Sequence, residues 1–279
     1  MLAEFRGKCN FRQYIPCKTN KYGIKILAMC DAKMFYTSIM EVYVGKQPDG
    51  PYKISNSSYD VVTRLCQHIV GTGRNVTIDN WFTSIPLVKT LLSDFKLTVI
   101  GTIRKDKREL LVEFCKPVSR PEKKQQFGFR NSLVSYIPKK GKNILLVSSL
   151  HHSDDINSET GDLQKPEMVT EYNKTKGGVV VVDKLVSSYD CARNTRRWPM
   201  VIFYTMLNVA RINAHVIFTS NNPETKILKR NFLRELAHNL IRPYLQRRVP
   251  LTNIPRSLQI RLKEVCGIEK DNQEKCCST

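Results

Sequence analysis

Two aspartates lie at positions where their carboxylates could take part in catalysis. Asp79 ends the apolar run NVTI of residues 75–78, and acids at strand ends gather at the sheet edge where α/β active sites lie. Asp183 follows Gly177–Gly178 and four consecutive valines. In phosphodiester chemistry, two Mg²⁺ ions about 3.5–4 Å apart activate the attacking oxygen and stabilise the leaving one. Because Mg²⁺ prefers carboxylate oxygens, three acids from separate elements would hold such a pair.

Both aspartates also have ordinary explanations. Asp79 can be a turn residue before a helix that starts at Thr83 or Ser84. Asp183 can be a solvated carboxylate on a helix surface. The valines of residues 179–182 favour a strand by propensity, whereas the two glycines before them can mark the start of a helix. In a helix, Val180 and Asp183 would share one face, because residues three apart are neighbours.

The net charge of the chain limits the classes of partner that it could bind. The 279 residues carry a formal net charge of +20, and 41% of them are hydrophobic. An apolar fraction of this size is typical of a globular chain, not a disordered one. An excess of basic residues is usually matched by a polyanion, most often nucleic acid, with an acidic membrane surface or a ribosomal site as the lesser alternatives.

One apolar stretch, residues 198–221, is long enough for a membrane span by length alone. Five polar residues interrupt it: Thr205, Asn208, Arg211, Asn213 and His215. Because arginine near the centre of a bilayer is costly, the sequence predicts a half-buried helix and no membrane partner. The nine cysteines show no CxxC pair, and the N-terminus lacks an apolar signal region. We therefore expect reduced thiols in an intracellular protein.

Periodicity and turn signals predict the elements of the first hundred residues. We expect two strands joined by a turn at Asp31–Lys33, a helix over 59–70, and a strand ending at Asp79. A helix capped by Thr83 or Ser84 and a strand over 97–103 follow. A hairpin followed by alternating helices and strands favours an α/β or α+β sheet covered by helices.

The rest of the chain changes character twice. Residues 104–165 read as an inserted β-rich unit that includes two strands around a turn at 138–141. Beyond the apolar helix of 198–221, we expect a basic amphipathic helix over 226–248 and a short helix over 257–265.

Four motifs, in order along the chain, resemble the piggyBac transposase family. They read FRGKCNFRQYIPCKTNKYGIKILAMCD, RNVTIDNWFTSIPLVKTLL, YNKTKGGVVVVDKL and NTRRWPM. The resemblance covers roughly residues 1–250. It implies an α/β fold with an RNase H-like catalytic core that a β-rich insertion interrupts, followed by a helical dimerisation and DNA-binding segment. It also implies Mg²⁺-dependent cut-and-paste transposition at TTAA sites, DNA as partner, a homodimer and a nuclear location.

The resemblance implies a division of the chain into five segments. The RNase H-like core would occupy 1–105 and 166–189, the insertion domain 106–165, the helical segment 190–268 and a polar tail 269–279. A cysteine-rich zinc domain that normally follows in the family has no counterpart in this sequence.

Only part of the family's metal site carries over. The first family aspartate precedes the FRG motif in a pattern like DEQLLGFRG, so in this chain it would fall just before Met1. The second matches Asp79, a Mg²⁺ ligand only in a completed site. The third directly follows GGV in a GGVDxxD-like motif, where this chain has Val180. Asp183 is the retained secondary acid of that motif.

Valine cannot bind Mg²⁺, and we expect neither Glu4 nor Asp31 to replace the missing acids. Glu4 is out of register, and Asp31 falls in the hairpin turn. The resemblance therefore predicts a truncated, degenerate transposase in which the family reaction is lost. The alternative is a domesticated, non-enzymatic DNA-binding protein on the same scaffold. A weaker alternative, independent of the family, is a generic basic RNA-binding protein.

Basic residues within the family motifs are the candidate DNA contacts, because lysine and arginine neutralise phosphates. An alternative for each is a solvated surface charge, and for Trp198 we favour a packing role. The candidate DNA-binding residues are Arg6, Lys8, Arg12, Lys174, Lys176, Arg193, Arg196 and Arg197.

Overall fold

The computed structural model describes residues 1–18, 20–110, 123–128, 131–139, 142–153, 155–163 and 165–268. The chain divides into two compact units, Met1–Val216 and Ile217–Thr279. The first contains two β-sheets with helices packed on them, and the second is helical. The predicted α/β class is therefore confirmed, and the predicted helical segment of 190–268 lies across both units.

Strand β3 (Tyr22–Cys30) is the centre of the first sheet. It pairs antiparallel with β1 (Leu2–Glu4), β2 (Gln13–Tyr14) and β4 (Thr37–Val42). The turn between β3 and β4 is closed by Asp31, whose Oδ1 accepts hydrogen bonds from the backbone N–H groups of Lys33 and Met34. The predicted hairpin and its turn are confirmed, and Asp31 is a turn residue because its carboxylate serves the local backbone.

The second sheet has the strand order β5-β6-β9-β8-β7. Strands β5 (Asn75–Ile78) and β6 (Thr98–Thr102) are parallel because helix α2 (Ile85–Ser93) connects them. The other pairs, built from β7 (Lys123–Gly128), β8 (Asn131–Lys139) and β9 (Lys142–Ser148), are antiparallel. Strand β9 pairs with β6, so the β-rich stretch extends the β5–β6 sheet. Pro138 lies in β8, and residues 140–141 of the predicted turn lie outside the described residues.

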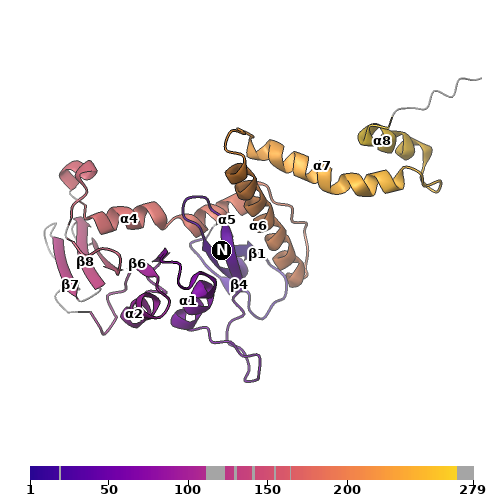
Figure 1. Ribbon diagram of the computed structural model, residues 1–279. Coiled ribbons are helices and arrows are strands. Elements are labelled where there is room, and N and C mark those ends of the chain that lie inside the picture. Colours follow the sequence, from indigo (N-terminus) through magenta and orange to yellow (C-terminus); the bar gives the residue numbers. More distant parts are fainter. Residues whose placement is uncertain are drawn as a thin grey trace, which may run out of the picture. The chain divides into compact units, whose positions relative to one another are not determined.

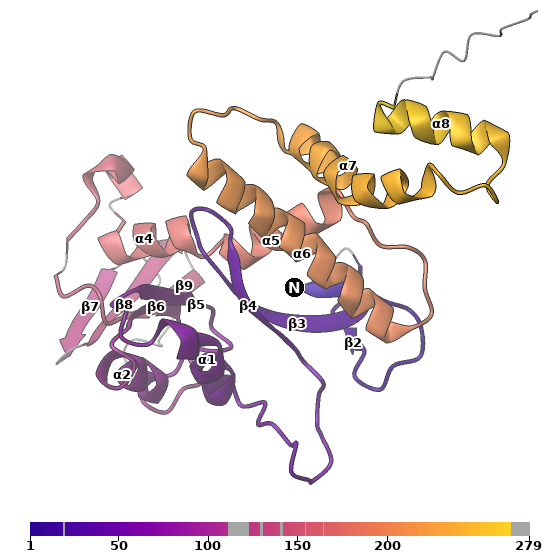
Figure 2. The same ribbon diagram turned by 45° about the vertical axis from the view of Figure 1, so that its right-hand side comes forward.

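Helices cover both faces of this sheet (Figures 1 and 2). Helices α1 (Ser58–Cys66) and α2 lie on one side, and α4 (Glu167–Thr175) lies on the other. Neighbouring residues of β6 serve the two cores, since successive strand residues face opposite ways. Val99 packs with Leu87 and Leu91 of α2, whereas Ile100 packs with Met168 and Val169 of α4.

Local sequence signals fix the ends of α1 and α2. The hydroxyl of Ser57 accepts from the N–H of Asp60 and caps α1, which continues into a 3-10 turn at Gln67–Ile69. Ser84 caps α2, and proline occupies its first turn. Both predicted helices are confirmed.

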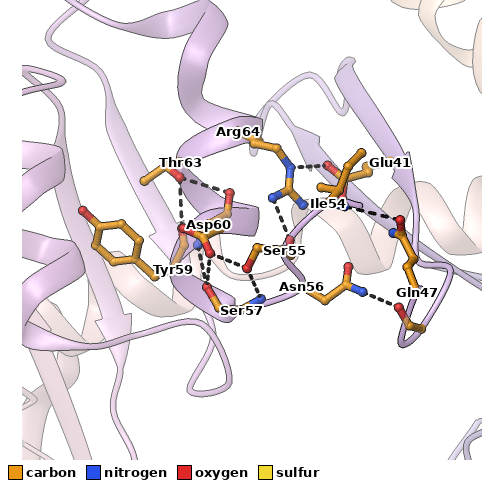
Figure 3. A network of polar contacts seen from close by, with 11 residues as sticks. Glu41, Gln47, Ile54, Ser55, Asn56, Ser57, Tyr59, Asp60, Thr63 and Arg64 are labelled. Carbon is orange, nitrogen blue, oxygen red and sulfur yellow. Dashed lines mark hydrogen bonds and ion pairs between the residues drawn. The ribbon is translucent and has the colours of Figure 1, made fainter. Parts of the chain in front are cut away.

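The loop between β4 and α1 is held by a polar network, which Figure 3 shows from close by. Arg64 of α1 binds both carboxylate oxygens of Glu41 in β4, at 2.7 and 3.1 Å, and donates to the carbonyl oxygen of Ser55 at 2.8 Å. Two-point binding between arginine and a carboxylate fixes orientation as well as distance, so α1 is held firmly against the first sheet.

Helix α5 (Gly178–Ser188) belongs to the first unit, and helix α6 (Trp198–Asn221) begins in the first unit and ends in the second. The four valines are helical, although their propensity alone favours a strand. Tertiary packing decides this, because Gly178 lies against the turn after β3. A Cβ at residue 178 would stand 3.5 Å from Cα of Ala32, and the side chain of Val182 is fully buried.

Helix α6 is long and apolar enough to cross a membrane by length and composition. Its polar side chains nevertheless bind the rest of the first unit. Asn213 pairs with both backbone groups of Thr37, at 2.9 and 2.8 Å, and Arg211 donates to the carbonyl oxygens of Leu185 and Val186 at the end of α5. These are the contacts of a helix packed on a globular unit, as the sequence predicts.

The second unit contains α7 (Lys229–Arg248) and α8 (Arg256–Cys266). Both helices are predicted from the sequence. On the expected apolar face of α7, Phe232 is buried beside Phe218, whereas Leu240 and Tyr244 are exposed. Gly267 ends α8 in the left-handed conformation, with φ +67°.

Candidate functional site

Asp79 is both a strand-end acid and a turn residue. It directly follows β5, and its exposed side chain accepts the backbone N–H groups of Trp81 at 2.9 Å and Phe82 at 3.4 Å through Oδ1. Its carbonyl oxygen accepts the hydroxyl of buried Thr83 at 2.7 Å. The turn interpretation is therefore confirmed, and the turn that binds Oδ1 also fixes the carboxylate at the end of β5.

A lysine that sequence reasoning missed lies beside Asp79. The ammonium of Lys25, in β3, stands 4.5 Å from the ring centre of Trp81 and 4.9 Å from that of Tyr43. Burial lowers the pKa of Lys25, and the charge of Asp79 partly opposes this shift. Such a cation between two aromatic rings is stabilised electrostatically. Lys25 lies in the YGIK part of the first motif, which was its available signal.

The third family position lies at the start of α5. Val180 is the third residue of the helix, and its side chain is 63% exposed. One turn further on, Asp183 forms an ion pair with Lys18, whose Nζ lies 2.9 Å from Oδ2. Asp183 is therefore a half-buried carboxylate with a cationic partner from the N-terminal loop, and Val180 is a surface residue, not part of the core.

Contacts between distant elements hold these motifs in place. The hydroxyl of Thr77 in β5 donates to that of Thr175, the last residue of α4, at 2.7 Å. Tyr172, also in α4, has a raised pKa. Burial is the larger cause, and the negative charge of Asp79 contributes. Since Gly178 also lies against the turn after β3, the connection between α4 and α5 is held by both sheets.

Two basic loops, residues 5–12 and 190–198, lie against each other; we call them the paired basic loops. A Cβ at Gly7 would stand 3.0 Å from the carbonyl oxygen of Arg196, so only glycine allows this approach. The rings of Phe11 and Trp198 meet edge to face with centres 5.1 Å apart. This contact supports the packing role expected for Trp198, which remains 38% exposed.

The candidate DNA-binding residues fall into two groups. Five exposed side chains on the paired basic loops form no hydrogen bond or ion pair with another described residue: Arg6, Lys8, Arg193, Arg196 and Arg197. The others differ in their contacts or position. Arg12 binds two carbonyl groups of its own loop, while Lys174 and Lys176 lie at the end of α4, where Lys176 donates to Asn173 at 2.6 Å.

Comparisons with known proteins agree with this arrangement. A family model described as "Transposase IS4" matches residues 1–215. A cryo-EM structure of a piggyBac transposase synaptic complex with hairpin DNA is similar, with a TM-score of 0.86 and 38% sequence identity. The similarity covers 98% of this chain and 57% of that transposase chain, so this chain spans little more than half its length. The chain belongs to the piggyBac transposase family.

Transposases of this DDE type generally use a divalent metal ion, and a two-ion site needs several carboxylates close together. Among the described residues, no three His, Cys, Asp or Glu side chains come together as a possible metal site. Lys18 binds the carboxylate of Asp183, Val180 offers no oxygen, and Asp31 serves its turn. Glu4 is an exposed residue of β1, opposite Gly23 of β3.

Proposed function

We propose that this chain derives from a piggyBac-type transposase and no longer performs the family's Mg²⁺-dependent DNA strand cleavage and transfer at TTAA sites. Val180 is the observation that carries this proposal. It occupies an exposed position at the start of α5, where the family motif has an aspartate, and its isopropyl group has no lone pair for a metal ion. The retained acids, Asp79 and Asp183, cannot complete a two-ion site by themselves.

We also infer that the first unit is built around the RNase H-like core expected from the family, with residues 106–165 as its insertion. Two positions support this inference: Asp79 directly follows β5, and Val180 lies in the first turn of α5. The Thr77–Thr175 hydrogen bond joins β5 to the end of α4, the helix that precedes α5 in the chain.

A cleavage assay tests the loss of the reaction. The purified chain is incubated with a TTAA-flanked transposon end and Mg²⁺ or Mn²⁺, and strand nicks and hairpins are resolved on a denaturing gel. We expect neither product. Nicking that disappears in Asp79→Ala would refute the proposal, whereas nicking that persists in this variant indicates a contaminating nuclease.

The second candidate function is non-enzymatic DNA binding by a domesticated protein, and it is compatible with the first. The five exposed cations of the paired basic loops favour it, because each can neutralise a phosphate. The solved relative, bound to hairpin DNA in its synaptic complex, adds support by similarity. We therefore propose that these loops bind DNA.

Salt dependence tests DNA binding. If all five cations contact phosphates, they contribute about 4.5 to the magnitude of the slope of log K against log salt, at about 0.9 per phosphate. Arg196→Gln should lower the magnitude by about 0.9. Lys53→Gln is the control, since this exposed lysine pairs with Asp49 outside the loops. If the wild-type chain does not bind duplex DNA at low salt, the proposal is contradicted.

The family also supports proposals of a homodimer and a nuclear location. Light scattering coupled to gel filtration would give the mass of the chain in solution, and a monomer at all concentrations contradicts the dimer. Microscopy of the tagged chain in cells would test the location, and exclusion from the nucleus contradicts it.

A further inference from the structure

Arg12 directs its guanidinium at the backbone of its own loop. Its Nη1 donates to the carbonyl oxygen of Arg6 at 2.8 Å and to that of Gly7 at 3.0 Å. Its Cζ lies 5.3 Å from the ring centre of Tyr22. Tyr22 is paired with Tyr14 across β2 and β3, and their rings are 4.8 Å apart. Arg12 thus joins the turn of residues 6–7 to the first sheet.

Arg6 and Lys8 flank the glycine that this contact fixes. Gly7 approaches the backbone of Arg196, and a Cβ at Gly7 would also stand 2.4 Å from Cζ of buried Phe5. The backbone therefore has little room at this point. Its position decides where the charges of Arg6 and Lys8 stand relative to the loop that carries Arg196 and Arg197.

We propose that Arg12 is a positioning residue for DNA binding and does not contact phosphate itself. It holds the backbone of residues 6–8 so that Arg6 and Lys8 share one surface with the arginines of the second basic loop. This inference rests on the proposed DNA binding and replaces the phosphate-contacting role that the sequence suggests for Arg12.

Positioning and phosphate contact have different requirements. A phosphate contact needs a positive charge at residue 12 and releases counterions, so it contributes to the salt slope. Positioning needs a donor nitrogen at the reach of Nη1, which makes both hydrogen bonds, and a planar group that can lie near Tyr22. Lysine keeps the charge, but its nitrogen lies one bond closer to the backbone and it has no planar group, so Arg12→Lys separates the two roles.

The experiment measures the Kd of the full chain for a short fluorescent DNA duplex by anisotropy, over a series of KCl concentrations. We expect Arg12→Lys and Arg12→Gln to weaken binding equally, by about 5- to 30-fold, because binding must then order the freed backbone. Both variants should keep the wild-type salt slope. Arg6→Gln is the matched comparison, and should lower the magnitude of the slope by about 0.9.

The opposite pattern overturns the proposal: Arg12→Lys binds as the wild type does, and Arg12→Gln lowers the slope magnitude by about 0.9. Failure of the DNA-binding proposal is recognised from the wild-type chain, which then shows no binding in its own titration. That outcome overturns the role of Arg12 as well. Amide hydrogen exchange at residues 6–9 without DNA should be faster in Arg12→Lys. Unchanged exchange there also overturns the positioning role.

If the Arg12 variants do not fold, Gly7→Ala disturbs the same turn from the other side. Its added methyl group meets Phe5 and the backbone of Arg196, so the loop must shift. We expect weaker binding with an unchanged salt slope, whereas wild-type affinity in this variant contradicts a role for the geometry of the turn.

Discussion

At residue 180, stability and chemistry make different demands. Val180 is exposed in the first turn of α5, which has no acidic residue. The positive end of the helix dipole would stabilise a carboxylate there, and valine and aspartate have similar helix propensities. We therefore expect Val180→Asp to leave the free energy of unfolding unchanged or to raise it by up to about 1 kcal/mol, measured by urea denaturation.

Val182→Asp is the matched control for this substitution. Residue 182 is fully buried in the same helix, so an unpaired carboxylate there should cost several kcal/mol or prevent folding. If Val180→Asp were as damaging as Val182→Asp, position 180 would belong to the core, and the surface site argued above would be wrong.

Lys25 should give the stability a measurable dependence on alkaline pH. Burial lowers its pKa below 10.5 in the folded state. Between that lowered pKa and 10.5 the unfolded chain binds more protons than the folded chain, so stability rises with pH. We expect the unfolding free energy of the wild type minus that of Lys25→Met to become more positive as pH rises through this window. If this value stays constant or becomes more negative, the effect of burial is contradicted.

At the scale of elements, Asn213 makes the contact that holds α6 against β4. Its amide binds both the N–H and the C=O of Thr37, which is buried. Asn213→Ala leaves both groups without this partner and should cost about 1–3 kcal/mol in thermal or urea unfolding. Asn222→Ala is the control, because Asn222 directly follows α6 and its exposed amide donates to the carbonyl oxygen of Phe218 in that helix, and the variant should stay within about 0.5 kcal/mol of wild type.

The elements that sequence reasoning predicted are those with local signals. Ser57 and Ser84 cap their helices through neighbouring N–H groups, and Asp31 closes its own turn, so a short window contains the cause. The four valines gave conflicting local signals, because their propensity favours a strand whereas the two glycines before them can mark the start of a helix. Their helix packs through buried Val182 and through the contact of Gly178 with Ala32, far away in the sequence, which no local propensity can reveal.

The candidate site divides in the same way. Asp79 was accessible from the sequence because it ends an apolar strand. Its neighbour Lys25 was accessible only as part of the first family motif, since a lysine in a β-strand gives no sign that Trp81 and Tyr43 will lie against it. The pairing of the two basic loops likewise depends on a contact between Gly7 and Arg196 that only the tertiary fold creates.

At the scale of the whole molecule, cysteine reactivity should report unfolding. The described cysteines are free thiols; Cys17 and Cys191 are exposed, whereas Cys66 is fully buried and burial raises its pKa to about 12. We expect an alkylating reagent at mildly alkaline pH to label Cys17 and Cys191 quickly, and Cys66 only after denaturant is added. Labelling is measured by peptide mass spectrometry. Equal labelling of Cys66 in the native chain contradicts this packing.

The exposure of Val180 also has a genetic consequence. Because Val180 is exposed and we expect aspartate there to cost no stability, selection that acts through stability and abundance should not remove either residue. The valine codons GUU and GUC become aspartate codons by a single base change. A lineage that keeps this chain only for its shape or its basic surface can therefore drift in either direction at residue 180, and only selection on the reaction itself would retain the aspartate.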